Sequence, residues 1–202
     1  MEKKILGIDL SGKEGKTTGF CLIYEKIVLV VGSFRSLNAI KEYINVLRPD
    51  IVAIDAPLNH PTSGHYRDCD IMLKKYGMHP LPLTMKSMKM LIERAISLTN
   101  YLDTININYI ETFPAGALKM LGFKRKPKSK AERFRYFKQI SKLYGLSSKI
   151  DPMELTKDEF DAYICAIAGY AYTKKRYIAV TGKECKIILP FIENLDYNED
   201  QI

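Results

Sequence analysis

Long apolar segments are missing from this chain of 202 residues. No run approaches the ~18 consecutive apolar residues that mark a membrane-spanning helix. The N-terminus, Met1-Glu2-Lys3-Lys4, leads directly into a strand-like segment and lacks the apolar stretch and cleavage site of a signal peptide. We therefore expect neither a transmembrane helix nor a secretory signal.

Cysteine is also scarce. The four cysteines are widely spaced and form no C-x-x-C pair, so the sequence indicates neither a zinc site nor a disulfide framework. This usage is typical of a reducing compartment, and we expect a cytoplasmic protein. The four residues are Cys21, Cys69, Cys165 and Cys185.

Internal repeats, low-complexity tracts and clear linkers are absent as well. With 47% hydrophobic residues, the chain can bury a sizeable core. We expect one domain over residues 1–202, with a helical insertion at about 59–104 and a basic helical segment at about 119–149.

Positive charge is concentrated in one part of the chain. Between Lys119 and Lys149 there are eleven Lys/Arg and one acid, a net charge of +10, whereas the whole chain carries +8. The rest of the chain therefore nets −2, and its last residues, 193–202, are acidic. A basic block on a nearly neutral protein is typical of polyanion binding, although a solvated surface helix has the same composition.

The pattern of apolar residues predicts a mixed α/β order. Residues 3–9, Thr18–Tyr24 and Ile27–Gly32 are expected to form an antiparallel meander. The unbroken apolar segment Ile51–Asp55 is typical of a parallel strand buried on both faces, and a further strand is expected at Ile105–Glu111.

Helical spacing and capping residues predict the remaining elements. Helices are expected at Leu37–Leu47, at Tyr66–Tyr76, from a Thr84 cap to about Tyr101, at Pro114–Leu121, from a Ser129 cap through Leu143, and from a Thr156 cap to about Lys175. Two short strands, Tyr177–Val180 and Lys186–Leu189, are expected around Thr181-Gly182.

Three acidic residues lie where they are costly for a fold and useful for chemistry. Asp9 ends the first strand, Asp55 ends the strand at 51–55, and Asp161 borders the buried stripe of the last long helix. Isolated carboxylates at the edge of a core are unfavourable unless a cation accompanies them, and Mg²⁺ prefers oxygen ligands. The sequence therefore predicts a divalent-metal site. The alternative is that Asp9 and Asp55 each cap a following loop or turn, and that the helix dipole stabilises Asp161.

Two further acids are candidates for supporting roles. Glu111 ends the strand at 105–111, and Asp158 lies three residues before Asp161 on the same helix face. Either could supply a further metal ligand. A plain strand-end carboxylate and a helix-dipole interaction remain open for Glu111 and Asp158, respectively.

Basic side chains are candidates for contacts with a substrate. Arg67 and Asp70 are three apart on one helix face, so they could pair with each other, or Arg67 could hold a scissile phosphate. Phosphate contacts position a nucleic acid without reading its sequence. From the basic segment we assign such contacts to Lys124, Arg125, Lys126, Lys128 and Lys130.

The segment Gly15-Lys16-Thr17 imitates the end of a phosphate-binding P-loop. Position 10 holds Leu10 instead of the first glycine, and a strand rather than a helix is expected to follow. We therefore interpret this segment as a hairpin turn.

Four short motifs in order resemble the DUF429 family of predicted nucleases, over about residues 4–175. They are Ile54-Asp55-Ala56-Pro57-Leu58, Arg67-Asp68-Cys69-Asp70, Ile110-Glu111-Thr112-Phe113-Pro114 and Asp158-Glu159-Phe160-Asp161-Ala162, together with Gly7-Ile8-Asp9-Leu10-Ser11 on the first strand. The resemblance implies a ribonuclease H-like α/β fold, with a mixed sheet of three antiparallel strands plus parallel strands, flanked by helices.

The same resemblance implies two-metal phosphodiester chemistry with Mg²⁺ or Mn²⁺. Asp9 would be the central metal-bridging carboxylate, and Asp55 would lie on the neighbouring strand. Asp158 and Asp161 would match the D-x-x-D-A helix of resolvase-type nucleases.

The first functional hypothesis is therefore a metal-dependent nuclease whose partner is DNA or RNA. One alternative is an ATP-dependent phosphotransferase or ATPase of the actin type, which shares the core fold but needs two such domains. Stabilisation of the protein against heat by ATP would indicate this alternative.

Another alternative is a non-catalytic nucleic-acid-binding protein on a nuclease-like scaffold. Binding that survives EDTA and Asp9→Asn, without cleavage, would indicate that one.

Overall fold

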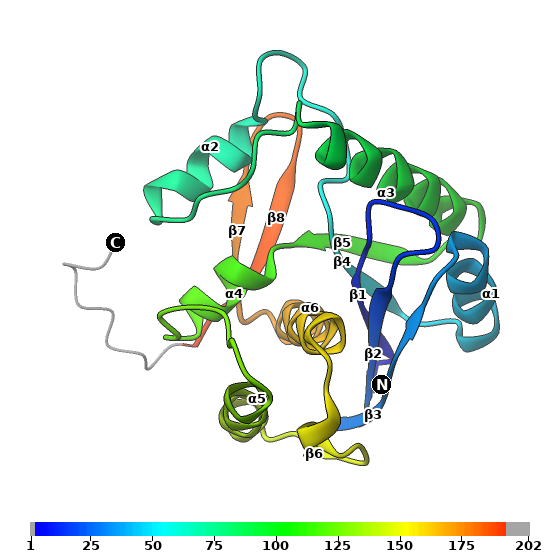
Figure 1. Cartoon of the computed structure of the whole chain (residues 1–202), viewed down its shortest axis with the longest axis vertical. Coiled ribbons are helices and arrows are strands. Elements are labelled where there is room, and N and C mark those ends of the chain that lie inside the picture. The colour runs from blue at the N-terminus through cyan, green and yellow to red at the C-terminus, as the bar shows by residue number, and fades with distance from the viewer. Residues whose placement is uncertain (1–2, 193–202) are drawn as a thin grey trace.

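The computed structural model describes residues 3–192, which form an eight-stranded sheet with helices on both faces (Figure 1). The strands are β1 (Ile5–Asp9), β2 (Thr18–Tyr24), β3 (Ile27–Phe34), β4 (Ile51–Asp55), β5 (Asn108–Thr112), β6 (Ser147–Ser148), β7 (Tyr177–Thr181) and β8 (Lys186–Pro190). The helices are α1 (Leu37–Leu47), α2 (Asp68–Lys75), α3 (Lys86–Thr104), α4 (Pro114–Met120), α5 (Lys130–Tyr144) and α6 (Lys157–Thr173), with a 3-10 turn at Pro152–Glu154. The acidic residues 193–202 lie outside the described part. Within it, no helix combines the length and hydrophobicity that crossing a membrane would need.

The strand order is β6-β3-β2-β1-β4-β5-β8-β7. β1, β2 and β3 form the antiparallel meander that the sequence predicts, and β4 and β5 continue the sheet parallel to β1. β8 lies parallel to β5, and β7 pairs antiparallel with β8. The predicted mixed sheet flanked by helices is confirmed.

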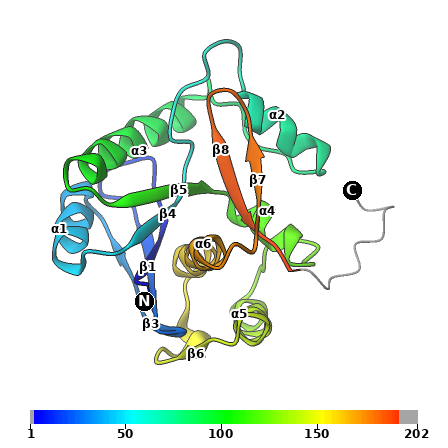
Figure 2. The same ribbon diagram turned by 180° about the vertical axis from the view of Figure 1, so that it is seen from behind.

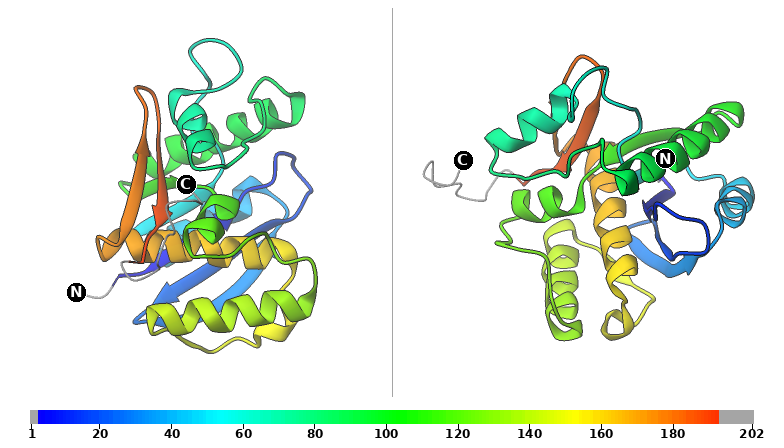
Figure 3. Two further views of the ribbon diagram at one scale, coloured as in Figure 1. Left: turned by 90° about the vertical axis from the view of Figure 1, so that its left-hand side faces the viewer. Right: turned by 45° about the horizontal axis from the view of Figure 1, so that its top comes forward.

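Side chains alternate along each strand, so the sheet separates two buried clusters. Leu6 packs with residues of α1 and α3, whereas Ile5 and Ala53 pack with α6. Figures 2 and 3 show α1 and α3 on one side of the sheet, and α6 with α5 on the other. Asp9 and Asp55 are in step with Ile5 and Ala53, so both acids face α6.

Two glycines let α6 approach the sheet at backbone distance. A Cβ on Gly7 would lie 2.2 Å from the carbonyl oxygen of Ala162 and 2.3 Å from the amide nitrogen of Ala166. A Cβ on Gly19 would lie 2.2 Å from the carbonyl oxygen of Asp158. No side chain fits at either position, so β1 and β2 carry the N-terminal half of α6 directly on their backbone.

Both predicted caps of the last two helices are confirmed. The Ser129 hydroxyl accepts from the amide of Glu132 at 3.1 Å and begins α5. Thr156 begins α6 with a capping box, because its hydroxyl accepts from the Glu159 amide while the Glu159 carboxylate accepts from the Thr156 amide at 2.9 Å. These caps fix where the two helices on the α6 face begin.

The predicted cap of α3, Thr84, was wrong by one residue. Met85 is the residue before the helix, and its side chain makes no capping bond. The hydroxyl of Thr84 instead bonds His65 Nδ1 in the preceding loop at 2.6 Å. The hydroxyl that could have capped the helix is therefore used elsewhere. The two-residue strand β6, which pairs parallel with β3, was not predicted because it is too short to show alternation.

The hairpin between β1 and β2 confirms that the chain has no P-loop at this position. β2 begins at Thr18, directly after the Gly-Lys-Thr segment, so a strand follows where a P-loop needs a helix. The hydroxyls of Ser11 and Thr18 bond each other at 2.9 Å and close the base of the turn.

A disulfide joins Cys69, in the first turn of α2, to Cys185, at the turn before β8, with Cα atoms 5.9 Å apart. The expectation that the cysteines would not pair was therefore wrong for these two. The two residues are 116 positions apart, and only the fold brings them together. The turn between β7 and β8 packs tightly here, since a Cβ on Gly182 would lie 2.8 Å from the amide nitrogen of Cys69. Cys21 and Cys165 are free and buried.

Candidate functional site

Two carboxylates lie side by side at the carboxyl ends of β1 and β4. The strands are parallel, and Asp9 is directly opposite Asp55 in their register. Each aspartate follows four buried residues and is itself only partly buried. Because neighbouring strands lie ~4.8 Å apart, two acids in this position necessarily interact. Ligands of open α/β sheets bind at this end of the strands.

α6 brings a third carboxylate to the same place. Asp161 is 3% exposed, and Asp158 lies one turn earlier on the same face, partly exposed. Gly19, the partner of Asp9 in the β1–β2 pairing, contacts the backbone of Asp158. The first turns of α6 are thereby held beside Asp9. We call Asp9, Asp55 and Asp161 the acidic cluster.

Burial and mutual repulsion disfavour the charged forms of Asp9 and Asp55. Burial is the main cause that raises the pKa of Asp9, and the charges of Asp55 and Asp161 add to it. Burial also raises the pKa of Asp55, although the charge of Lys126 opposes the rise. Asp9 and Asp55 lie close enough for each to affect the pKa of the other. Acids with raised pKa values that face one another are typical of functional sites.

Lys126 supplies a positive charge to this cluster. Its ammonium donates to Asp161 Oδ2 at 2.8 Å. Burial opposes the charge of Lys126, but the carboxylates of Asp161, Asp55 and Asp9 outweigh it and raise the pKa of the ammonium. One ammonium therefore faces three carboxylates, and the balance of charge is incomplete.

The donor chemistry of the acidic cluster fits a hard divalent cation, because it offers carboxylates from three different elements. Their present arrangement is not yet that of a metal site. Within residues 3–192, no group of three or more His, Cys, Asp or Glu side chains is gathered closely enough to hold an ion. Lys126 already donates to one oxygen of Asp161. That Asp9, Asp55 and Asp161 would hold Mg²⁺ or Mn²⁺ stays a prediction.

Arg67 lies inside the protein, not at the surface. Its side chain is 0% exposed, and its guanidinium binds both oxygens of Asp70 at 3.0 Å and both oxygens of Glu111 at 2.8 and 2.5 Å. A fifth contact, at 2.8 Å, reaches the side-chain oxygen of Asn59. The pairing with Asp70 that the sequence left open is confirmed, and no donor remains for a scissile phosphate. We call Arg67, Asp70 and Glu111 the arginine cluster.

Glu111 is separated from the acidic cluster by the sheet itself. It is opposite Ile54 in the β4–β5 register, whereas Thr112 is opposite Asp55. Side chains alternate along a strand, so Glu111 points to the face away from α6. Its carboxylate also accepts from the amide of Leu58 at 3.1 Å. The structure thus does not gather Glu111 with the candidate metal ligands, because Arg67 has engaged it.

The predicted phosphate-binding residues lie on the segment that carries Lys126. Residues 121–129 connect α4 to α5, and we call them the basic loop. Lys124, Arg125 and Lys128 are exposed, and Lys130, also exposed, begins α5. Their contacts with a substrate stay a prediction, but the loop reaches the acidic cluster through Lys126.

Cys165 is a site neighbour that sequence reasoning did not single out. It lies one turn after Asp161 on α6 and is fully buried. Burial raises the pKa of its thiol well above the usual range, and the charges of Asp55 and Asp9 add to the rise. The i, i+4 spacing from Asp161 was the signal that could have identified it.

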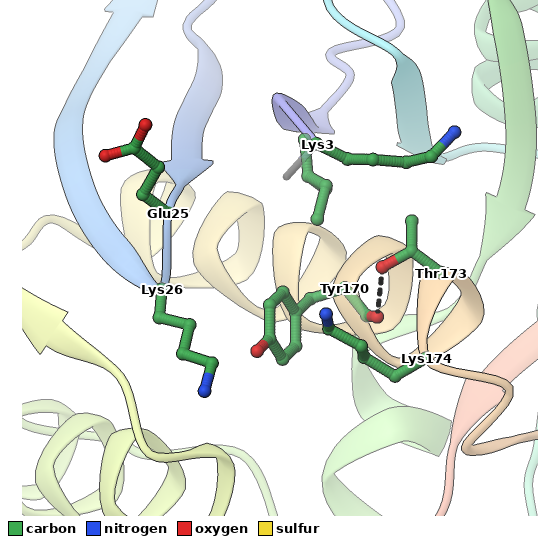
Figure 4. A pocket seen from close by; sticks show the side chains of 7 residues that line it. Lys3, Glu25, Lys26, Tyr170, Thr173 and Lys174 are labelled. Atoms are coloured by element: carbon green, nitrogen blue, oxygen red, sulfur yellow. Dashed lines mark hydrogen bonds between the residues drawn. The ribbon is translucent and has the colours of Figure 1, made fainter. Parts of the chain in front are cut away.

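A small hollow lies at the opposite end of β1 and α6 (Figure 4). Lys3, Lys26 and Lys174 line it around the ring of Tyr170, and the hydroxyl of Thr173 donates to the Tyr170 carbonyl at 2.7 Å. Its lining includes none of the acidic cluster. The hollow is therefore separate from the candidate site.

The sequence matches the model of a known protein family. The family model described as "Protein of unknown function (DUF429)" matches residues 7–184. The chain belongs to the DUF429 family. The resemblance found in the sequence motifs is confirmed, and the match includes every residue of the acidic cluster. No match was found among proteins of curated function.

Solved structures similar to this DUF429 protein include Holliday junction resolvases. RuvC of T. thermophilus in complex with Holliday junction substrate has a TM-score of 0.50 and 12% sequence identity, covering 85% of this chain and 96% of that chain. The yeast mitochondrial Holliday junction resolvase Ydc2 has a TM-score of 0.46 and 12% identity, covering 81% and 76%. The first of these likenesses supports the ribonuclease H-like fold that the sequence predicts.

Proposed function

We propose that this DUF429 protein is a metal-dependent nuclease that hydrolyses phosphodiester bonds in nucleic acid. The observation that carries the proposal is the acidic cluster. Asp9 and Asp55 end adjacent parallel strands, Asp161 approaches from α6, and the one ammonium bound there leaves the carboxylates short of positive charge. A divalent cation would supply that charge.

In this proposal, each acidic residue of the site has its own role. Mg²⁺ or Mn²⁺ held by Asp9, Asp55 and Asp161 would supply an activated water and neutralise charge on the reacting phosphate. Asp158, one turn before Asp161, supports the same edge of the site. The raised pKa values of Asp9 and Asp55 mean that binding a cation would displace a proton from the pair.

The basic loop supplies the substrate contacts in this proposal. Lys124, Arg125, Lys128 and Lys130 are exposed beside the lysine that reaches the acidic cluster. Phosphate contacts from such a loop would hold a strand without reading its bases. The fold shared with a resolvase makes branched DNA the first substrate to test, alongside single-stranded and duplex DNA, hybrid and RNA.

The test is a cleavage assay with end-labelled substrates of each kind, in Mg²⁺ or Mn²⁺, using wild type and Asp9→Asn side by side. We expect cleavage that requires metal, is abolished by EDTA and is lost in Asp9→Asn. Far-UV circular dichroism of Asp9→Asn serves as the control that the variant is folded. Full activity in that variant would contradict the assignment of the acidic cluster.

A second candidate is a non-catalytic nucleic-acid-binding protein. The ion pair of Lys126 with Asp161 favours it, because a carboxylate engaged by an ammonium is less available to a metal. In that case a mobility-shift assay would show binding that persists in EDTA and in Asp9→Asn, with no cleavage in any metal. Loss of binding on substitution of Lys124 and Lys128 would place the interface on the basic loop.

A further inference from the structure

We infer that the Lys126 ammonium and a divalent cation are alternative occupants of the acidic cluster, so that Lys126 sets how much metal the protein requires. This inference rests on the proposed function, because it takes the acidic cluster as the metal site. It adds a regulating residue to that site, one that competes with the metal without being a ligand.

The position of Lys126 is the first observation. Its ammonium lies 2.8 Å from Asp161 Oδ2, and it interacts electrostatically with Asp55 and Asp9 as well. It therefore lies against one of the carboxylates that would hold a cation and within electrostatic reach of the other two. The Asp161 side chain is 5% exposed, so its oxygen that accepts from Lys126 has little access to solvent cations while Lys126 remains.

The basic loop is built to hold Lys126 in this position. Glu132 of α5 binds the guanidinium of Arg125 at 2.5 and 3.0 Å and the amide of Lys128 at 2.6 Å, which braces the chain on both sides of Lys126. The ring of Phe123 packs on Tyr136 with centroids 4.2 Å apart. These contacts with α5 fix the backbone of the basic loop before and after Lys126. They leave the Lys126 side chain itself free to move.

Charge makes the two occupants exclusive. An ammonium and a divalent cation among the same three carboxylates would repel each other strongly in a partly buried site. The side chain of Lys126 is 35% exposed and its stem is flexible, so it can withdraw to solvent without moving the braced backbone. Metal binding then has to displace the ammonium, and that displacement lowers the apparent metal affinity.

The test is titration calorimetry of the full chain with Mn²⁺, in wild type, Lys126→Met and Lys149→Met. Methionine keeps an unbranched stem of similar length and removes the charge. Lys149 is exposed at the far end of the basic segment and provides the same change of net charge. We expect Lys126→Met to bind Mn²⁺ roughly tenfold more tightly, about 1.4 kcal/mol, and Lys149→Met to match wild type.

Thermal unfolding gives a second measurement that does not depend on catalysis. Without metal, Lys126→Met should melt below wild type, because three carboxylates then lack their counter-charge. Saturating Mn²⁺ should raise its melting temperature more than it raises that of wild type. Lys149→Met should show neither difference.

The outcomes separate this inference from the nuclease proposal. If Lys126→Met binds Mn²⁺ more tightly while no nucleic acid is cut by any protein, the inference holds and the nuclease proposal fails. If wild type cuts in a metal-dependent way but Lys126→Met binds Mn²⁺ equally or less tightly, only the inference is overturned. Absence of Mn²⁺ binding in all three proteins would overturn both.

Discussion

The arginine cluster and the acidic cluster are two groups of carboxylates in one small protein. They differ in how completely a positive charge neutralises them. In the arginine cluster, one guanidinium binds two carboxylates through four bonds and reaches Asn59 with another contact. In the acidic cluster, one ammonium binds one oxygen of Asp161, and Asp9 and Asp55 are left facing each other.

Under the proposed function, this difference distinguishes a structural site from a site that awaits a metal ion. Buried acids that are fully paired hold loops in place. Glu111 joins β5 to Leu58, and Arg67 joins the start of α2 to Glu111 and Asn59. Acids that repel one another raise the energy of the free protein, and a ligand that neutralises them recovers that energy. Four predictions test this contrast.

The largest expected effect is on the arginine cluster. Arg67→Met leaves Asp70 and Glu111 buried without a counter-charge, which typically lowers the free energy of unfolding by about 3–5 kcal/mol. Urea denaturation of both proteins measures it. Arg125→Met, which breaks an exposed ion pair, is the matched control and should leave the urea midpoint nearly unchanged. A loss below about 1 kcal/mol at Arg67 would contradict the structural role.

The disulfide beside the arginine cluster should have the next largest effect. Cys69→Ala opens a link that spans 116 residues, and the loss of such a link typically costs about 2–4 kcal/mol. Wild type treated with dithiothreitol should lose the same amount in a urea titration, whereas Cys69→Ala should not respond to the reductant. A wild type whose stability ignores dithiothreitol would mean that the two cysteines do not pair in solution.

The acidic cluster should respond in the opposite direction, because it is destabilising without metal. The pKa of Asp9 is raised above its usual value of 3.8, so the folded state keeps a proton that the unfolded state has lost. In EDTA, stability should therefore fall as pH rises from about 4 to neutral. Asp9→Asn should flatten this dependence and stabilise the metal-free protein at pH 7.5 by on the order of 1 kcal/mol, after allowance for its partial exposure.

Urea titrations at several pH values, with both proteins in EDTA, measure this difference. Wild type and Asp9→Asn with parallel pH profiles would show that the carboxylates of Asp9 and Asp55 do not repel each other as the register implies.

The smallest effect is expected at Asp158. Asp158→Asn loses a favourable interaction with the N-terminus of α6 but relieves repulsion on Asp9, so the net change in stability should stay within about 0.5 kcal/mol. Under the proposed function, it should also reduce cleavage less than Asp161→Asn does. Equal losses of cleavage in the two variants would place Asp158 among the metal ligands.

Local patterns in the sequence predicted the elements that position the acidic cluster. The apolar segment ending in Asp55 predicted a parallel strand, and the Thr156 cap predicted where α6 begins. Those signals lie within a few residues of the positions they determine.

What the sequence did not determine depends on contacts between distant residues. Arg67 binds Glu111, which is 44 positions away in the sequence, and Lys126 binds Asp161, which is 35 positions away. The sequence pattern around Arg67 is that of an ordinary helix start, and a lysine in a run of basic residues resembles its neighbours. Only the packing of the chain distinguishes Lys126 from the lysines that face solvent.

The close contact of α6 with β1 also limits how this family can diverge. Any side chain at Gly7 would overlap the backbone of α6 between Ala162 and Ala166, so a larger residue there requires the whole helix to move outward. Asp161 would move with it, away from Asp9. When DUF429 sequences are compared, a retained set of aspartates is therefore not enough to infer a retained site. The residue at the position of Gly7 shows whether those aspartates can still meet.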